Sequence, residues 1–437
     1  MLTVRRRQII VVAAGFAVTS MTCSIVFGYG VYEALYEDMS TQSATPFTGQ
    51  SSALITLIGI LAIAFMTIGG PWAILWAKLF SPQLVVSSGG LIFGIAFILA
   101  SFGTKLWHFA LTQGVLAGVG TCLSYVTTTA VVPGWFEKNR SLAMGVVFAA
   151  TGVGGMIWPP ILRALITSVG FRNTLRISGS ISGIMVMLAG LGLAWDLKTA
   201  QVANVEAISL KRRRWAFARV PVIDFKIAKT NRFIILAFGN FIQSAAYSTP
   251  LFFYAAYAQA LGYDKNTASV FITISNASNF VSRLIIGWAA DRYGRLNALA
   301  VCTVISATAV FGFWAPSTLC RAPGCRTKAD VLFILFAILY GSFAGAFISL
   351  FPASLLELFG RKDYAGVNGS LSFIRGTGAL LGTPLTSLLV RRATALTSPP
   401  GYERATITVG VLMVVAAICT VCVRVEFTSG QAWKWKA

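Results

Sequence analysis

Two arginines lie inside long apolar stretches of the sequence. Arg283 falls within residues 266 to 290, and Arg375 falls within residues 366 to 390. A charged side chain in a membrane-spanning helix costs about 2.5 to 3.5 kcal/mol on insertion scales, so it is kept where it faces protein or a water-filled cavity. Two guanidinium groups facing one cavity would bind a carboxylate in bidentate fashion. The sequence therefore predicts an anion site at these arginines, unless one of them extends its side chain to the membrane surface.

Other polar side chains recur at helical spacing around this expected site. Asn279 lies one turn before Arg283, and Tyr247 belongs to a polar face of the preceding apolar segment. Near the N-terminus, Tyr29 and Glu33 share one helix face with two further tyrosines. We expect Asn279, Tyr247 and Tyr29 to shape the substrate site. Glu33 is the candidate proton carrier, with an interfacial glutamate beside an aromatic belt as the equal alternative.

The composition indicates which elements must position these residues. Of 437 residues, 56% are hydrophobic and 11% are charged, whereas soluble domains carry about 25% charged residues. Twelve apolar stretches are long enough to cross a bilayer, which takes about 17 to 25 residues. They lie near residues 9–36, 49–77, 82–103, 106–133, 141–168, 174–195, 231–260, 266–290, 294–316, 329–356, 366–390 and 404–425. We predict an all-α membrane protein with twelve transmembrane helices.

The helices fall into two groups of six, separated by the only long polar stretch. Residues 1–195 would form an N-terminal six-helix bundle, residues 196–230 a cytoplasmic linker, and residues 231–437 a pseudo-symmetric C-terminal bundle with a short cytoplasmic tail. The linker contains the basic run Lys211-Arg-Arg-Arg214, which most simply binds anionic lipid headgroups. Nucleic acid is not an expected partner, because no folded domain accompanies this run.

The net charge of +21 is distributed as the positive-inside rule requires. With the N-terminus inside, about 22 Lys and Arg residues fall on cytoplasmic segments and about 10 on the outer side. Both termini are therefore predicted to be cytoplasmic. No targeting motif is visible, so the plasma membrane is the expected location and an organelle membrane the alternative.

Cys320 and Cys325 bracket four residues of one outer loop, where an oxidising compartment would allow a disulfide.

A charged turn connects the eighth and ninth apolar stretches. Its conformational gate residues would be Gly287, Asp291, Arg292, Gly294 and Arg295. The glycine before the last arginine permits a tight turn, the aspartate can accept hydrogen bonds at the positive end of a neighbouring helix, and the arginines favour the cytoplasmic side. The spacing resembles the cytoplasmic loop signature of the major facilitator superfamily. The equivalent loop between the second and third stretches keeps little of it.

Residues 135–160 resemble one family within this superfamily. The run begins Trp135-Phe136-Glu-Lys-Asn-Arg140 and ends at Pro159-Pro160, as in the fungal-type branch of the monocarboxylate porter family. The Arg-Gly pair at Arg375 is similar to the same family's helix 11. The resemblance implies substrate contact at Arg283. The family's aspartate four residues earlier is replaced here by Asn279, so no proton relay is expected at that position.

These features together predict a secondary active transporter that moves an organic anion, a mono- or dicarboxylate, by alternating access. Protons are the expected coupling ion, because no nucleotide-binding loop is present. The sequence contains one histidine and no metal or nucleophile constellation, so neither an enzyme nor a cofactor is expected. Export of a larger secondary metabolite or toxin is the alternative transport function. A receptor that binds a nutrient without translocating it stays open.

Overall fold

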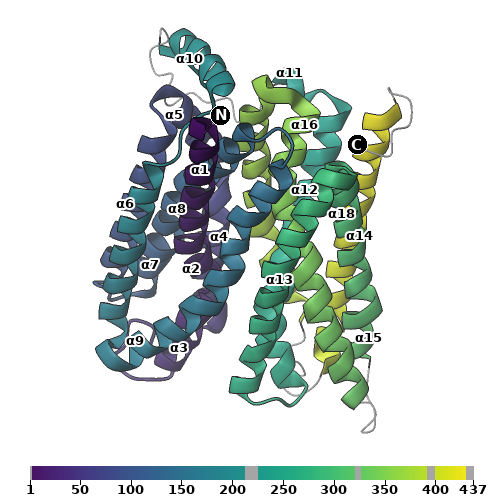
Figure 1. The fold of residues 1–437 in the computed structure, drawn as a ribbon. Helices are drawn as coiled ribbons and strands as arrows, with labels where there is room; N and C mark the ends of the chain where they lie inside the picture. The colour runs from purple at the N-terminus through teal and green to yellow at the C-terminus, as the bar shows by residue number, and fades with distance from the viewer. Residues whose placement is uncertain (1, 212–224, 320–325, 391–398, 430–437) are drawn as a thin grey trace.

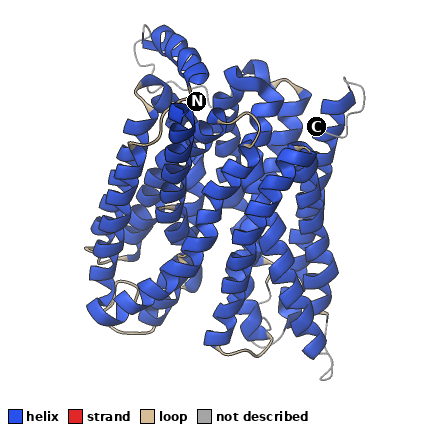
Figure 2. Cartoon of the chain, viewed as in Figure 1, coloured by secondary structure: helices blue, strands red, loops and turns tan. Residues whose placement is uncertain are grey.

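The computed structural model describes residues 2–211, 225–319, 326–390 and 399–429. Within these ranges every regular element is a helix, and short loops connect them (Figure 2). The predicted disulfide between Cys320 and Cys325 and most of the basic run in the linker lie outside the described residues. The long apolar stretches of the sequence have thus folded as helices throughout the described part of the chain.

The N-terminal bundle contains the first half of the helices. These are α1 (Leu2–Met21), α2 (Cys23–Phe27), α3 (Gly30–Ser40), α4 (Ser52–Ile68), α5 (Gly70–Leu79), α6 (Pro82–Ala100), α7 (Leu106–Phe109), η1 (Ala110–Leu116), α8 (Ala117–Val131), η2 (Val132–Trp135) and α9 (Arg140–Gly190). The first span, expected as one helix, is interrupted at Thr22 and again at Gly28. The Thr22 hydroxyl donates to the Val18 carbonyl at 2.8 Å, which competes with regular helix geometry at the first break.

The linker and the C-terminal bundle contain the other half. These are α10 (Leu197–Lys211), α11 (Phe225–Ala228), α12 (Asn231–Ala260), α13 (Lys265–Tyr293), α14 (Arg295–Ala309), η3 (Val310–Trp314), α15 (Ala315–Thr318), α16 (Arg326–Leu388), η5 (Pro399–Tyr402) and α18 (Glu403–Ser429). The turn between α13 and α14 is the single residue Gly294, with φ 105°. A positive φ favours glycine, which carries no Cβ.

Two of the helices are each two spans joined by a break. The backbone of α9 leaves helical geometry at Gly170, and that of α16 does so at Gly360. Eight helices of the described ranges are long and apolar enough to cross a membrane, and α4 with α5 forms a bent ninth. Counting both halves of α9 and of α16, and adding α12, gives the twelve spans that the sequence predicts.

The two bundles stand side by side, with α10 at the end where α1 begins and α18 ends (Figure 1). We call this end the linker end. The bundles meet where α9 packs against α13 and where α4 and α5 pack against α16. Small residues permit the first contact: a Cβ added at Gly287 would lie 2.8 Å from the Ser141 carbonyl oxygen, and one at Gly152 would lie 2.8 Å from that of Asn276. We call Gly145, Gly152 and Gly287 the glycine seam.

Candidate functional site

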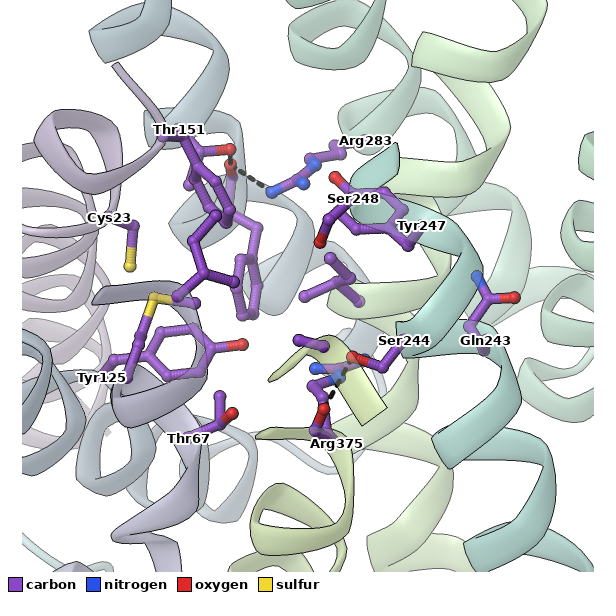
Figure 3. A pocket seen from close by; sticks show the side chains of 16 residues that line it. Cys23, Thr67, Tyr125, Thr151, Gln243, Ser244, Tyr247, Ser248, Arg283 and Arg375 are labelled. Carbon is purple, nitrogen blue, oxygen red and sulfur yellow. Dashed lines mark hydrogen bonds between the residues drawn. The ribbon is translucent and has the colours of Figure 1, made fainter. Parts of the chain in front are cut away.

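A pocket lies between the two bundles, and both contribute side chains to it (Figure 3). Helices of the N-terminal bundle supply Cys23, Phe27, Ile63, Met66, Thr67, Tyr125, Phe148 and Thr151. Helices of the C-terminal bundle supply Gln243, Ser244, Tyr247, Ser248, Arg283, Ile348, Arg375 and Ala379. We call this the central pocket. Three of the five predicted substrate residues, namely Arg283, Arg375 and Tyr247, line it together.

Arg283 reaches from α13 toward the opposite bundle. Its side chain is buried, and Nη1 donates a 2.6 Å hydrogen bond to the Phe148 carbonyl oxygen. The guanidinium group also lies over the Phe148 ring, 5.3 Å from the ring centroid. Tyr247 lines the same pocket, and the Arg283 Nε has no partner among the described residues. Arg283 therefore holds donor capacity that its surroundings leave unused.

Arg375 lines the pocket from α16 of the same bundle. Its guanidinium group lies 5.9 Å from the ring centroid of Phe347 and 5.6 Å from that of Phe351. Its backbone carbonyl accepts a 2.7 Å hydrogen bond from the Ser244 hydroxyl, which fixes α16 against α12. Among the ion pairs of the described residues, none involves Arg283 or Arg375. The central pocket consequently carries two cations that no carboxylate of the described ranges neutralises, which favours an anionic ligand.

Several lining residues were not expected to form the site. The Tyr125 hydroxyl points into the pocket in Figure 3. Gln243 is buried, and neither its amide nitrogen nor its amide oxygen has a partner among the described residues. Cys23 lines the pocket as a free, buried thiol. Periodicity places such residues on a helix face without showing which face meets the partner bundle.

Asn279 and Tyr29, both expected at the substrate, lie elsewhere. The Asn279 amide nitrogen donates a 3.0 Å hydrogen bond to the Gly341 carbonyl, so this side chain faces α16 inside its own bundle. The Tyr29 hydroxyl donates a 2.7 Å hydrogen bond to the Ile55 carbonyl, and its ring packs over Gly59. The structure therefore does not bring these two side chains to the central pocket, and their substrate contact stays a prediction.

Glu33 lies in α3, outside the set of side chains that line the central pocket. Its carboxylate accepts a 2.5 Å hydrogen bond from the Thr56 hydroxyl, and its side chain is half-buried. The tyrosines on the same face, Tyr32 and Tyr36, pack against each other with ring centroids 6.1 Å apart. The face is therefore an internal seam of the N-terminal bundle, with Glu33 at its margin.

The charged turn after α13 joins the two bundles at the linker end. Asp291 accepts hydrogen bonds from the Ser141 backbone nitrogen at 3.0 Å and from that of Leu142 at 2.8 Å, at the start of α9. Arg295 pairs with Asp291 at 2.9 Å and with Glu357 at 3.1 Å. Arg292 instead is exposed, with its guanidinium group over the rings of Trp288 and Tyr293. Asp291 thus contacts the opposite bundle, and Arg295 does so through a 3.1 Å hydrogen bond to the Ser141 hydroxyl.

A second charged cluster lies at the same end. Arg361 of α16 pairs with Asp196 at 2.6 Å and with Glu137 at 3.6 Å. Lys198 of α10 pairs with Glu137 at 3.2 Å. The hydrogen bond and charge of Lys198, followed by the charge of Arg361, lower the pKa of Glu137. We call these four residues the linker cluster, because they connect the C-terminal bundle to the start of the linker.

The comparisons with known proteins agree with this architecture. The agnestins efflux protein of Paecilomyces divaricatus is 27% identical over 97% of this chain and 89% of its own. The aspyridones efflux protein of Emericella nidulans is 27% identical over 88% of this chain and 72% of its own.

Within the described residues, no group of three or more His, Cys, Asp or Glu side chains is placed to hold a metal ion.

Solved structures share the fold at low sequence identity. The proton:xylose symporter XylE superposes with a TM-score of 0.69 at 12% identity, covering 99% of this chain and 97% of that one. A bacterial homologue of the iron transporter ferroportin, in an outward-facing state, gives 0.68 at 11% identity over 96% and 99%. The family model of the Major Facilitator Superfamily matches residues 10–319 and 236–432. The chain is therefore a multi-pass membrane transporter and belongs to the major facilitator superfamily.

Proposed function

We propose that this transporter moves an organic anion across the membrane by alternating access. The observation that carries the proposal is the convergence of Arg283 and Arg375 on one pocket between the bundles, with no carboxylate of the described residues paired to either. Keeping two unpaired guanidinium groups at this depth is costly unless a ligand or water solvates them. A carboxylate bound to both would recover that cost through charge-assisted hydrogen bonds.

The contacts between bundles define which side of the pocket is closed. Cross-bundle contacts gather at the linker end, where Asp291 accepts hydrogen bonds from the start of α9 and Arg361 pairs with Glu137. We propose that the linker end, and with it both termini, faces the cytoplasm, as the positive-inside distribution indicates, and that the membrane is the plasma membrane. The conformation then is closed on the cytoplasmic side, and the cycle requires the contacts of Asp291 and of the linker cluster to break.

Proton coupling completes the proposal, with Glu33 as the carrier. Its carboxylate has one hydroxyl partner, Thr56, and no ion pair among the described residues. A carboxylate in such surroundings can exchange a proton as the bundle changes its exposure. Glu33→Gln should leave counterflow of the anion intact and remove its acceleration by a pH gradient. An unchanged pH response in this variant excludes Glu33 as the carrier.

The monocarboxylate porter branch is the part of the superfamily that we propose for this chain. Two features support it: the aromatic and basic run that begins at Trp135 and the Arg-Gly pair at Arg375. The run now has a structural setting, because its Arg140 donates to the Pro133 and Phe136 carbonyls and fixes the entry to α9. The alternative cargo is a larger secondary metabolite, supported by the names of the two fungal relatives, which are both efflux proteins.

The test is counterflow in proteoliposomes with monocarboxylates, dicarboxylates, bulky aromatic acids and bulky neutral compounds. We expect Arg283→Gln and Arg375→Gln to abolish anion exchange while the protein still reaches the membrane. Arg163→Gln, which changes an exposed arginine of α9, is the matched control and should transport normally. Exchange of neutral compounds only, unaffected by the two pocket variants, would remove the anion proposal and favour the exporter.

A further inference from the structure

The lining of the central pocket is divided by chemical character between the bundles. Both cations come from the C-terminal bundle, with hydroxyls from Ser244, Tyr247 and Ser248 beside them. The larger apolar side chains come mostly from the N-terminal bundle: Phe27, Ile63, Met66 and Phe148. We call the first set the cationic wall and the second set the apolar wall. A ligand between the bundles contacts one wall on each side.

The threonine hydroxyls on the N-terminal side are already occupied. Thr67 donates to the Ala64 carbonyl at 3.4 Å, and Thr151 donates to the Phe148 carbonyl at 2.9 Å. Such bonds to the preceding helical turn leave little donor capacity for a ligand. The Tyr125 hydroxyl is the exception on this side, since it points into the pocket (Figure 3). The apolar wall can therefore solvate at most one uncharged polar group well.

We infer that the ligand is an amphipathic acid, with a single anionic head between Arg283 and Arg375 and an apolar body against Phe27, Ile63, Met66 and Phe148. This inference rests on the proposed anion transport and specifies its substrate class. Small hydrophilic acids leave the apolar wall uncovered and lose its contribution. Dicarboxylates place their second charge against that wall, where no cation of the described residues lines the pocket, and a charge without a partner is poorly tolerated in such surroundings.

The aromatic members of the apolar wall refine the class further. The Phe148 ring already lies beneath Arg283 and meets the Tyr125 ring edge at a centroid distance of 5.7 Å. The thioether of Met66 is flexible and polarisable, so it adapts to bodies of different shape. An aromatic or branched aliphatic body fits this wall, since ring edges and faces stack on Phe148.

The test measures binding to purified protein in lipid nanodiscs by calorimetry, with empty nanodiscs subtracting partition into lipid. The probes are butanoate, hexanoate, benzoate and succinate. Each methylene group that reaches the apolar wall should tighten binding about fourfold, and succinate should bind more weakly than hexanoate. Phe27→Ala should flatten this dependence on body size. Leu54→Ala, an exposed position of α4 outside the pocket, should leave it unchanged.

The outcomes separate this inference from the proposed function beneath it. Affinity that rises from butanoate to hexanoate in wild type, and rises less in Phe27→Ala, supports the amphipathic ligand. Succinate binding at least as tight as hexanoate, or affinity independent of body size, overturns the inference while anion transport lost in Arg283→Gln still stands. Absence of binding and of exchange for every acid overturns both the amphipathic ligand and the proposed anion transport. Should Phe27→Ala fail to fold, Phe27→Leu, which keeps an apolar body without the ring, replaces it and should weaken benzoate selectively.

Discussion

Replacing Asp291 with asparagine should open the linker end of the transporter. The Asp291 carboxylate is almost fully buried and holds the start of α9 through two hydrogen bonds, to the Ser141 and Leu142 backbone nitrogens. The asparagine side chain would keep one acceptor oxygen, but its amide nitrogen would face the second backbone N–H. It would also give up the negative charge that the positive end of α9 and the Arg295 guanidinium favour.

The size of the effect follows from these contacts. A hydrogen bond to a charged group contributes about 1.5 to 3 kcal/mol, and Asp291→Asn removes one and weakens the other. We therefore expect a shift of about 2 kcal/mol toward the conformation in which α9 and α13 separate at the linker end. That is about a 30-fold change in the equilibrium constant. A minor open population of about 1% would then rise to about one quarter.

Pulsed electron paramagnetic resonance between spin labels at Lys138 and Tyr293 measures this shift. Both positions are exposed and lie on opposite bundles at the linker end. Asp38→Asn, an exposed carboxylate of α3 away from the linker end, is the matched control and should leave the distances unchanged. A distance distribution in Asp291→Asn that matches wild type would refute the assignment of these hydrogen bonds to closure.

Three further predictions concern the charged clusters and the glycines. Glu137 pairs with Lys198 as a carboxylate, and this pairing lowers its pKa. The contribution of the ion pair to closure of the linker end is therefore complete above the ordinary pKa of about 4.3 and is lost as pH falls through the lowered pKa. The spin-label distances at the linker end should differ between wild type and Glu137→Gln by a constant amount from pH 8 to 5, and that difference should vanish in stronger acid. A difference that already disappears near neutral pH would contradict this role of the Glu137 carboxylate. Gly294→Ala forces a side chain into φ 105° and should cost about 1 to 3 kcal/mol, read as a lower unfolding temperature in detergent, whereas Gly366→Ala, where an added Cβ meets nothing within 4 Å, should not destabilise the protein. Gly145→Ala places its Cβ against a backbone carbonyl of α13 and should increase the distance between α9 and α13 in the same spin-label measurement; an unchanged distance would show that the helices tolerate a methyl group there.

The sequence predicts the fold well because each membrane-spanning helix requires a long apolar stretch that is easily recognised. Each span needs about 20 apolar residues, and the charged turn at Asp291 occurs at a definite place between two spans. The sequence predicts separate spans at residues 141–168 and 174–195 and at residues 329–356 and 366–390, and the breaks at Gly170 and Gly360 fall in the short connections between them. Both glycines have positive φ, which the sequence allows without requiring.

The site was predictable only for side chains that are costly in a membrane. An arginine has few tolerable positions there, so Arg283 and Arg375 could be assigned to one cavity. Asn279 shares a helix stripe with Arg283 but donates to Gly341 instead, because an amide is satisfied by any nearby carbonyl. Tyr29 packs against Gly59. Which neighbour a helix face meets depends on the geometry of the bundle, and the periodicity of the sequence does not encode that geometry.

The glycine seam gives the interface between bundles an unusual mechanical character. At Gly287 and Gly152 the surfaces that meet are main-chain atoms, whereas each bundle is interlocked internally by stacked rings such as Tyr36 on Phe47 and Trp314 on Phe336. Where main-chain surfaces meet, few side-chain rotamers have to change when the bundles move relative to one another. The glycine seam therefore allows relative motion of the bundles, and a larger side chain at any of its positions should slow turnover more than it weakens ligand affinity.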